Sequence, residues 1–230
     1  MIDVLAPLGL LAMAGFVVLL VVTARRQQAS RRELFRQLAA AEGWEYLERG
    51  RDVVEPLARD FAGFGRFRSS SVGELSPEAT VVGRTGQGRV LCFLHGTREY
   101  EGQGRQWTVC LVEARKPLCG PLRIQPRNVR RIREVGGDPS VSFDDSGFEA
   151  GFAVTAPDPG SARRCIGPGV RRFLLSEHPK LPFPVDVQIR DRRVAAYLAR
   201  RNAIATNVSG LQALVRFTTG LVAALLDPGG

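Results

Sequence analysis

Histidine is nearly absent from this 230-residue chain, and lysine is too: only two of its 32 basic residues are lysine, so 30 are arginine. Neither of the two histidines, His95 and His178, has a nearby pair of cysteine, histidine or aspartate residues at the spacing of zinc ligands. Eight residues lie between Cys110 and Cys119, which is too many for a CxxC-type ligand pair. The sequence therefore predicts neither a metal site nor a cofactor.

Catalytic motifs are absent as well. There is no G-x-S-x-G and no GK[ST], and the glycines at 83, 86 and 88 lie between two β-rich runs, where they are typical of a hairpin turn and not of a phosphate-binding loop. Cys92 or Cys110 could pair with His95 as a nucleophile, but both cysteines lie in apolar runs, and burial makes a thiol unreactive. The chain is therefore predicted not to be an enzyme.

Charge is missing from one long segment, residues 4–24. As a helix, these 21 residues would be about 31 Å long, which matches the hydrocarbon core of a bilayer. A buried core helix and a cleaved signal peptide are the alternatives, and the small residues at 22–24 resemble a cleavage site. The run is longer than a signal-peptide core, and no basic residue precedes it, so we predict an uncleaved transmembrane helix.

The basic residues nearest to this segment all follow it: Arg25, Arg26, Arg31 and Arg32. The positive-inside rule then places the N-terminal residues 1–3 outside the cytoplasm and the domain 44–230 inside it, at the inner membrane of a bacterium. These four arginines are predicted to contact the anionic headgroups of the bilayer.

Four cysteines are present. In a cytoplasmic domain we expect all of them to be reduced. Cys92 and Cys110 are expected to pack in the core as small apolar side chains. A periplasmic domain would instead allow two disulfides, which makes the cysteines a test of the predicted orientation.

Local patterns predict an α+β domain. Residues 25–43 form a basic juxtamembrane segment with a helix over 31–42, which Ser30 caps and Gly43 ends. A helix is expected from Asp158 with a restart at Pro168, and a last helix from Ser209. Strands are expected at 44–47, 79–84, 89–95, 106–113, 122–125, 148–154, 185–189 and 194–198. Short turns between successive strands favour a mainly antiparallel sheet with flanking helices.

A second basic cluster follows the predicted strand at 122–125. It consists of Arg127, Arg130, Arg131 and Arg133, with no acidic residue between positions 120 and 133. Three interpretations are open: a solvated face in an arginine-rich protein, a surface for anionic headgroups, or a nucleic-acid surface. Nucleic acid is the least favoured, because aromatic residues are not interleaved with the arginines.

Several short motifs resemble a group of uncharacterised, single-pass membrane-anchored proteins of GC-rich bacteria. They are Gly43-Trp44-x-Tyr46, Trp107-Thr108-Val109, the segment 117–124, Phe148-x-x-x-Phe152-x-Val154, Asp158-Pro159 and Phe173-Leu174-Leu175. The resemblance covers most of the chain and implies an anchored cytosolic α+β domain. It carries over no catalytic residue, since the group has no assigned activity.

These observations together predict a membrane-anchored cytosolic interaction or scaffold module, whose partners are the lipid bilayer and a protein. The first alternative is a peripheral domain that binds anionic lipid through its arginine faces. The second is an enzyme with an unrecognised site.

Overall fold

The computed structural model describes residues 5–58, 61, 76–97, 105–127, 138–198 and 207–227. In the N-terminal helix it describes the side chain of Met13 and those from Phe16 onward. Residues 1–3, for which an extracytoplasmic position is predicted, lie outside this part of the chain.

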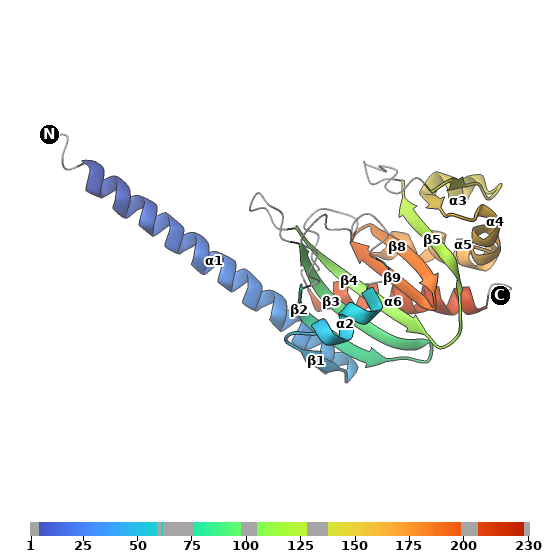
Figure 1. Ribbon diagram of the computed structural model, residues 1–230, viewed down its shortest axis with the longest axis horizontal. Coiled ribbons are helices and arrows are strands. Elements are labelled where there is room, and N and C mark those ends of the chain that lie inside the picture. The colour runs from blue at the N-terminus through green and yellow to red at the C-terminus, as the bar shows by residue number, and fades with distance from the viewer. Residues whose placement is uncertain are drawn as a thin grey trace.

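The described part is an α+β fold with a large antiparallel sheet and flanking helices, as the sequence predicts (Figure 1). Its elements, in chain order, are α1 (Leu5–Glu42), β1 (Glu45–Leu47), α2 (Arg51–Ala58), β2 (Ser76–Arg84), β3 (Gly88–Thr97), β4 (Arg105–Ala114), β5 (Cys119–Pro126), β6 (Ser140–Val141), α3 (Ser146–Gly151), β7 (Phe152–Thr155), α4 (Pro159–Cys165), α5 (Pro168–Glu177), the 3-10 turn η2 (His178–Lys180), β8 (Val185–Asp191), β9 (Arg193–Leu198) and α6 (Val208–Leu226).

Nine described strands form one sheet in the order β1-β2-β3-β4-β9-β8-β5-β7-β6, with antiparallel pairing at every junction. The two hairpins predicted from the sequence, β2-β3 and β8-β9, are both present. The β8-β9 hairpin turns at Asp191, whose φ of 54° lies in the left-handed region that aspartate tolerates better than most residues. The C-terminal hairpin inserts between β4 and β5, so residues distant in sequence become neighbours in the sheet.

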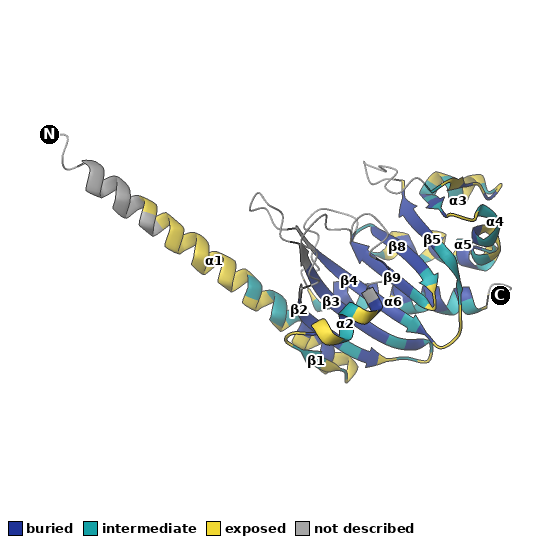
Figure 2. Cartoon of the chain, viewed as in Figure 1, coloured by how far each residue is buried: buried dark blue, intermediate teal, exposed yellow. Residues whose placement is uncertain are grey.

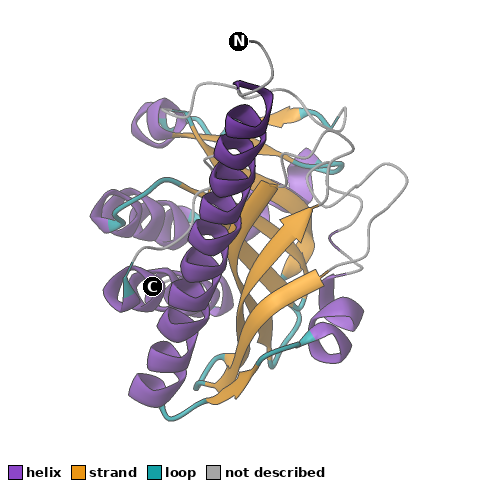
Figure 3. Cartoon of the chain, turned by 90° about the vertical axis from the view of Figure 1, so that its left-hand side faces the viewer, coloured by secondary structure: helices purple, strands orange, loops and turns teal. Residues whose placement is uncertain are grey.

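The two faces of the sheet are covered differently. On the face that we call the α6 face, helices α4, α5, α6 and the end of α1 pack over Val81, Cys110, Val187 and similar side chains. On the opposite face, the α2 face, Val54 and Leu57 of α2 contribute to a smaller apolar cluster. Figure 3 shows most of the helices gathered on one side of the sheet. Both faces of β4 are therefore buried, as its nearly continuous apolar run predicts.

Helix α1 corrects one prediction. The sequence predicts separate helices at 4–24 and 31–42 with a break between them, whereas the structure has a single helix of 38 residues. Residues 25–29 are arginine, glutamine and alanine without glycine or proline, so nothing in them interrupts a helix. The predicted end is correct: Gly43 has a φ of 67°, and the Trp44 N–H donates to the Ala39 carbonyl at 2.8 Å.

Local capping explains the other differences. The predicted strand 148–154 is half helix, because the Asp145 carboxylate accepts the Phe148 N–H at 3.0 Å and starts α3 before β7 begins. Asn207, and not Ser209, caps α6, through the Gly210 N–H at 2.8 Å. The cap at Asp158 and the restart at Pro168 are confirmed by α4 and α5.

The packing of Trp44 against β2 yields the first testable prediction. A Cβ at Gly83 would overlap the indole of Trp44, whereas a Cβ at Gly86 in the adjacent turn would have no atom within 4 Å. We expect Gly83→Ala to lower the free energy of unfolding by about 1–3 kcal/mol through overpacking. Gly86→Ala should change it by less than about 0.5 kcal/mol. Chemical denaturation of both variants in detergent, followed by tryptophan fluorescence, checks this, and equal effects would contradict it.

Candidate functional site

The most unusual surface of the molecule is the exposed apolar part of α1. The side chains of Met13 and of residues 16–22 are between 40% and 61% exposed, although all are large and apolar. Figure 2 shows this part of α1 as an exposed rod that projects from the domain. A soluble domain rarely exposes such a continuous apolar surface, which marks an interface with lipid or protein.

Among the described residues, one helix is long and apolar enough to cross a membrane, and this helix is α6. Half of it is buried, however, and Leu211, Leu214 and Leu221 are fully inaccessible in the core. Its position over β4 and β9 explains its apolarity, so α6 is the central core helix of the domain. The predicted span at 4–24 begins among side chains that the structure does not describe.

The C-terminal end of α1 belongs to the domain core. Phe35, Leu38 and Ala39 are buried in the same cluster as α6, and the Gln212 amide donates to the Glu42 carboxylate at 3.0 Å. The exposed segment and the domain are therefore parts of one continuous rigid element. Any surface that holds the apolar segment also sets the position of the domain.

The four arginines predicted to contact headgroups have two different environments. Arg25 and Arg26 are exposed directly after the apolar run. Arg31 and Arg32 are half-buried, and Arg32 donates to the Glu48 carboxylate at 2.7 Å. One turn later, the Arg36 guanidinium lies 5.1 Å from the centre of the Tyr46 ring. The structure thus leaves the first pair facing outward and ties Arg32 to the domain.

The second arginine cluster is described only at its first member. Arg127 is exposed, and its Nε donates to the Phe152 carbonyl at 3.3 Å. Arg130, Arg131 and Arg133 lie outside the described residues. No common face for these four arginines can be drawn from the described part of the chain.

A buried polar cluster lies on the α2 face, and no sequence motif indicates it. Along β8, Asp186 and Gln188 alternate with apolar residues, a pattern typical of a solvent-facing side, yet Asp186 is 1% exposed and Gln188 is inaccessible. Opposite them on β5, Arg123 and Gln125 are also buried. The α2 face is consequently apolar over β3 and β4 and polar over β8 and β5.

Hydrogen bonds join most of this cluster. The Asp186 carboxylate accepts from the Arg123 guanidinium at 3.0 Å and from the Gln125 amide at 3.3 Å. The Gln188 amide donates to the Tyr197 hydroxyl at 2.8 Å. A buried ion pair of this kind adds little stability, but removing one partner leaves an uncompensated buried charge. The pairing of distant strands, which the sequence alone did not show, brings these groups together.

An open depression of about 710 Å³ lies beside the end of α1. Its lining consists of Glu42, Gly43, Trp44, Glu45, Val82, Gly83, Arg84 and Arg89. Both carboxylates and guanidinium groups border this depression, so its electrostatics favour neither an anionic nor a cationic ligand.

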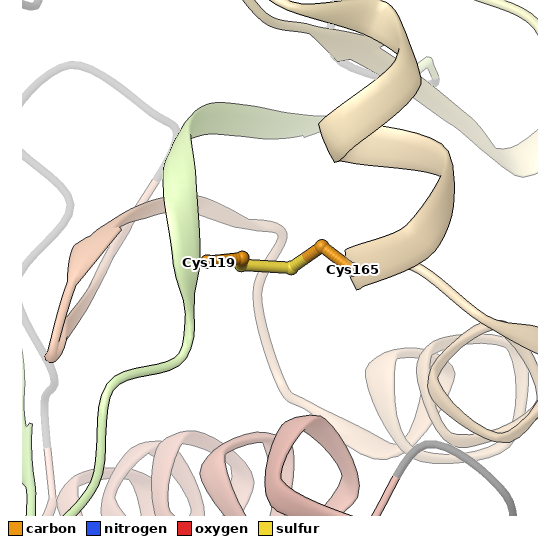
Figure 4. Close-up of a disulfide and its surroundings, with 2 residues drawn as sticks. All are labelled: Cys119 and Cys165. Carbon is orange, nitrogen blue, oxygen red and sulfur yellow. A yellow bond between two sulfur atoms is a disulfide. The ribbon is translucent and has the colours of Figure 1, made fainter.

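The cysteines correct a further prediction. Cys92 and Cys110 are buried thiols, as expected, and burial raises the pKa of Cys110 to about 12, which leaves no reactive thiolate at neutral pH. Cys119 and Cys165 are not reduced as expected: they form a disulfide that joins β5 to α4 (Figure 4). The spacing in sequence did not indicate this pair, because the two cysteines lie 46 positions apart.

The histidines are structural. His178, which lies outside every element predicted from the sequence, is buried, and its Nε2 accepts the Val185 N–H at 3.2 Å. His95 lies at a strand end as predicted, with its ring 6.0 Å from that of Trp107. Within the described residues, no group of three or more histidine, cysteine, aspartate or glutamate side chains could hold a metal ion.

Comparison with known proteins adds one likeness of fold. No family model matches the chain, and no curated protein matches it. Among solved structures, the chain is similar to the crystal structure of the mycobacterial trehalose monomycolate transport factor A, TtfA, with a TM-score of 0.53. The match covers 84% of this chain and 96% of that chain, at 15% sequence identity. At this identity the likeness concerns the fold alone.

Buried histidine makes stability depend on pH. Burial lowers the pKa of His95 to about 4, whereas an unfolded histidine titrates near 6.5. Between pH 4 and pH 6.5, His95 binds a proton in the unfolded chain but not in the folded one. The contribution of neutral His95 to the free energy of unfolding is therefore fully present above about pH 6.5 and is lost as the pH falls towards 4. The loss should reach up to about 3 kcal/mol.

Denaturation of the full chain in detergent at a series of pH values measures this loss. His95→Gln should flatten the profile between pH 6.5 and 4, although His178, whose pKa burial also lowers, will keep part of the slope. An unchanged slope in His95→Gln would show that other groups cause the pH dependence.

Proposed function

We propose that the chain is a membrane-anchored interaction module of a bacterium: α1 crosses the inner membrane once, and the α+β domain holds a protein partner at the cytoplasmic surface. The observation that carries the proposal is the exposed apolar run of α1, continuous with a helix end buried in the domain core. A helix that only supported the fold would not extend apolar side chains beyond the domain.

Charge supports the proposed orientation. Arg25 and Arg26 follow the apolar run directly, and Asp3 lies just before it. The positive-inside rule favours a cytoplasmic domain in this case. The disulfide between Cys119 and Cys165 argues in the opposite direction, because structural disulfides persist mainly in oxidising compartments. In the proposed orientation the two cysteines form a reversible pair.

The chemistry of the described residues supports binding over catalysis. The thiols of Cys92 and Cys110 are inaccessible, and the His95 and His178 rings serve packing and a backbone hydrogen bond. TtfA is a trehalose monomycolate transport factor, and the shared fold supports a partner among proteins of membrane transport.

Orientation is tested with reporters fused after Gly230. We expect alkaline phosphatase to be inactive there and a green fluorescent protein to be fluorescent, because the arginines keep the domain in the cytoplasm. Replacing Arg25, Arg26, Arg31 and Arg32 by glutamine should weaken this preference. Thiol trapping in acid should find the Cys119–Cys165 disulfide in part of the molecules only, because a reversible pair in the cytoplasm exchanges with cellular thiols. Active phosphatase with an oxidised pair would place the domain outside the cytoplasm.

The partner is tested by cross-linking in cells, followed by purification in mild detergent. We expect the full chain to form a discrete complex with an integral membrane protein. A variant with an unrelated span in place of residues 4–24 should retain the complex, because the domain provides the contact. A control that joins residues 1–29 to an unrelated soluble domain should lose it.

Two other outcomes of the cross-linking experiment would contradict the proposed interaction module. A partner that follows the span would make α1 the binding element. Contacts with anionic lipid alone, reduced by neutralising Arg25 and Arg26, would favour the lipid-binding alternative, which the exposure of these two arginines supports.

A further inference from the structure

Charged side chains form a straight row across one end of the sheet, which we call the basic row. The register places each member directly opposite the next, on five neighbouring strands. In order from β2 to β8 the members are Arg84, Arg89, Glu113, Arg193 and Arg190. Leu91 and Leu111, two positions away along β3 and β4, belong to the apolar cluster of the α2 face, so the basic row lies on the α2 face as well.

Backbone hydrogen bonds join the connections beside the basic row. The Arg115 N–H donates to the Gln87 carbonyl at 3.1 Å, and the Ala114 N–H donates to the Arg192 carbonyl at 2.6 Å. These bonds tie the β2-β3 turn, the end of β4 and the β8-β9 turn together. Arg84 is exposed, and the other four members of the row are half-buried. The backbone under the row is therefore fixed, while its side chains are open to solvent.

Positive charge exceeds negative charge along the basic row. Arg84 and Arg89 face each other, and so do Arg193 and Arg190, although like charges directly opposite each other destabilise a sheet. The Glu113 carboxylate forms an ion pair with Arg193 at 3.5 Å. No carboxylate of the described residues forms an ion pair with Arg84 or Arg89. The β2-β3 half of the row therefore carries charge that a carboxylate of another molecule can neutralise.

The basic row lies far from the end of the apolar segment of α1. Glu42, at the end of α1, borders the same open depression as Arg84 and Arg89. The helix continues for about 27 Å from Ala24 to Glu42. Attraction to anionic headgroups fades within a Debye length of about 8–10 Å. If residues 4–24 cross the membrane as proposed, the lipid surface is therefore out of reach of the row.

The length and surroundings of the basic row favour a peptide over a nucleic acid. Neighbouring strands lie about 4.8 Å apart, so five strands place the ends of the row roughly 19 Å from each other. An extended peptide covers this distance with about six residues. Single-stranded nucleic acid binds largely by stacking its bases on aromatic rings. The side chains that flank the row on β3, β4 and β9 are instead Leu91, Leu111 and Ala195.

We propose that the basic row binds an acidic, extended segment of a protein, about six residues long, which lies across the strands from Arg84 to Arg190. The inference rests on the proposed function, because this protein is the partner that the module holds. Glu42 and Glu45 border the depression at the Arg84 end, so they repel an acidic segment there and favour a path towards Arg190.

The first test measures the binding of an acidic peptide. The full chain in a neutral detergent is titrated against a labelled peptide of six glutamates with blocked ends, and the fluorescence anisotropy of the peptide is recorded. We expect saturable binding at low ionic strength that weakens as salt is added, because exposed ion pairs are screened. A peptide of six glutamines should not bind, and a thymidine oligonucleotide of equal charge should bind at least fivefold more weakly.

Matched variants locate the binding. Arg84→Gln combined with Arg89→Gln removes two charges from the basic row and should weaken binding at least tenfold. Arg164→Gln combined with Arg216→Gln removes two exposed charges from α4 and α6, so its affinity should stay within threefold of the wild type. Arg84→Lys combined with Arg89→Lys keeps the charge and should also stay within threefold. Melting curves without peptide confirm that each variant is folded.

Three outcomes of the titration overturn the proposal. The first is a wild type that does not bind the glutamate peptide. The second is an oligonucleotide that binds as tightly as the peptide or more tightly, which would make the row a nucleic-acid surface. The third is an equal loss of affinity in both double glutamine variants, which would reduce the binding to attraction by the net charge of the chain.

Cross-linking in cells separates this proposal from the proposed function. The variant with Arg84→Gln and Arg89→Gln should remain in the membrane fraction but lose the complex with the protein partner. A complex that this variant retains would overturn the role of the basic row and leave the interaction module intact. A wild type without any complex would contradict the module itself, and the peptide titration would then still decide whether the row binds acidic segments.

Discussion

The burial of the last turns of α1 in the domain core is the constraint on which the rest of the structure depends. Phe35 and Leu38 are each inaccessible or nearly so, and burying side chains of this size contributes roughly 1.5–3 kcal/mol apiece. Because the helix is unbroken, Phe35 lies about 15 Å along the axis from Arg25. The domain is thus held at a set distance and rotation relative to the apolar segment, whereas a flexible linker would let it move freely.

The two faces of the sheet differ in composition. The α6 face is wholly apolar in its centre and carries the stability of the domain. The α2 face gives up part of that stability, because its buried Arg123–Asp186 pair loses hydration that the ion pair only partly offsets. Replacing such a buried pair by apolar residues of similar volume often leaves the free energy of unfolding unchanged or raises it. Packing alone therefore does not explain why this half of the α2 face carries a buried ion pair.

Features with a local cause could be predicted from the sequence. Gly43 ends α1, Asp158 caps α4 and Pro168 restarts the chain as α5, because each acts within one helical turn. The break expected at residues 25–29 was wrong, since a polar composition alone does not interrupt a helix. Phe148 and Phe152 fit both an alternating strand and an i, i+4 helical pair, and only the Asp145 cap decides between them.

Features that depend on pairing between distant segments could not be predicted. Asp186 has the alternation of a solvent-facing residue and is buried only because β8 lies beside β5. The disulfide follows from the position of α4 over β5, which no spacing in the sequence encodes. The buried polar cluster of Arg123, Gln125, Asp186 and Gln188 is of this second kind, so a search for motifs passes over it.

The ends of the sheet would matter for a domain anchored to a membrane as proposed. Of the nine described strands, the two outermost are the shortest: β1 has three residues and β6 has two. An edge strand of ordinary length exposes a row of unpaired backbone groups that can recruit another copy. Molecules restricted to two dimensions collide far more often than the same number in solution, so a long open edge would promote aggregation. Edges this short leave little backbone for a neighbouring copy to join, and crowded copies can remain separate.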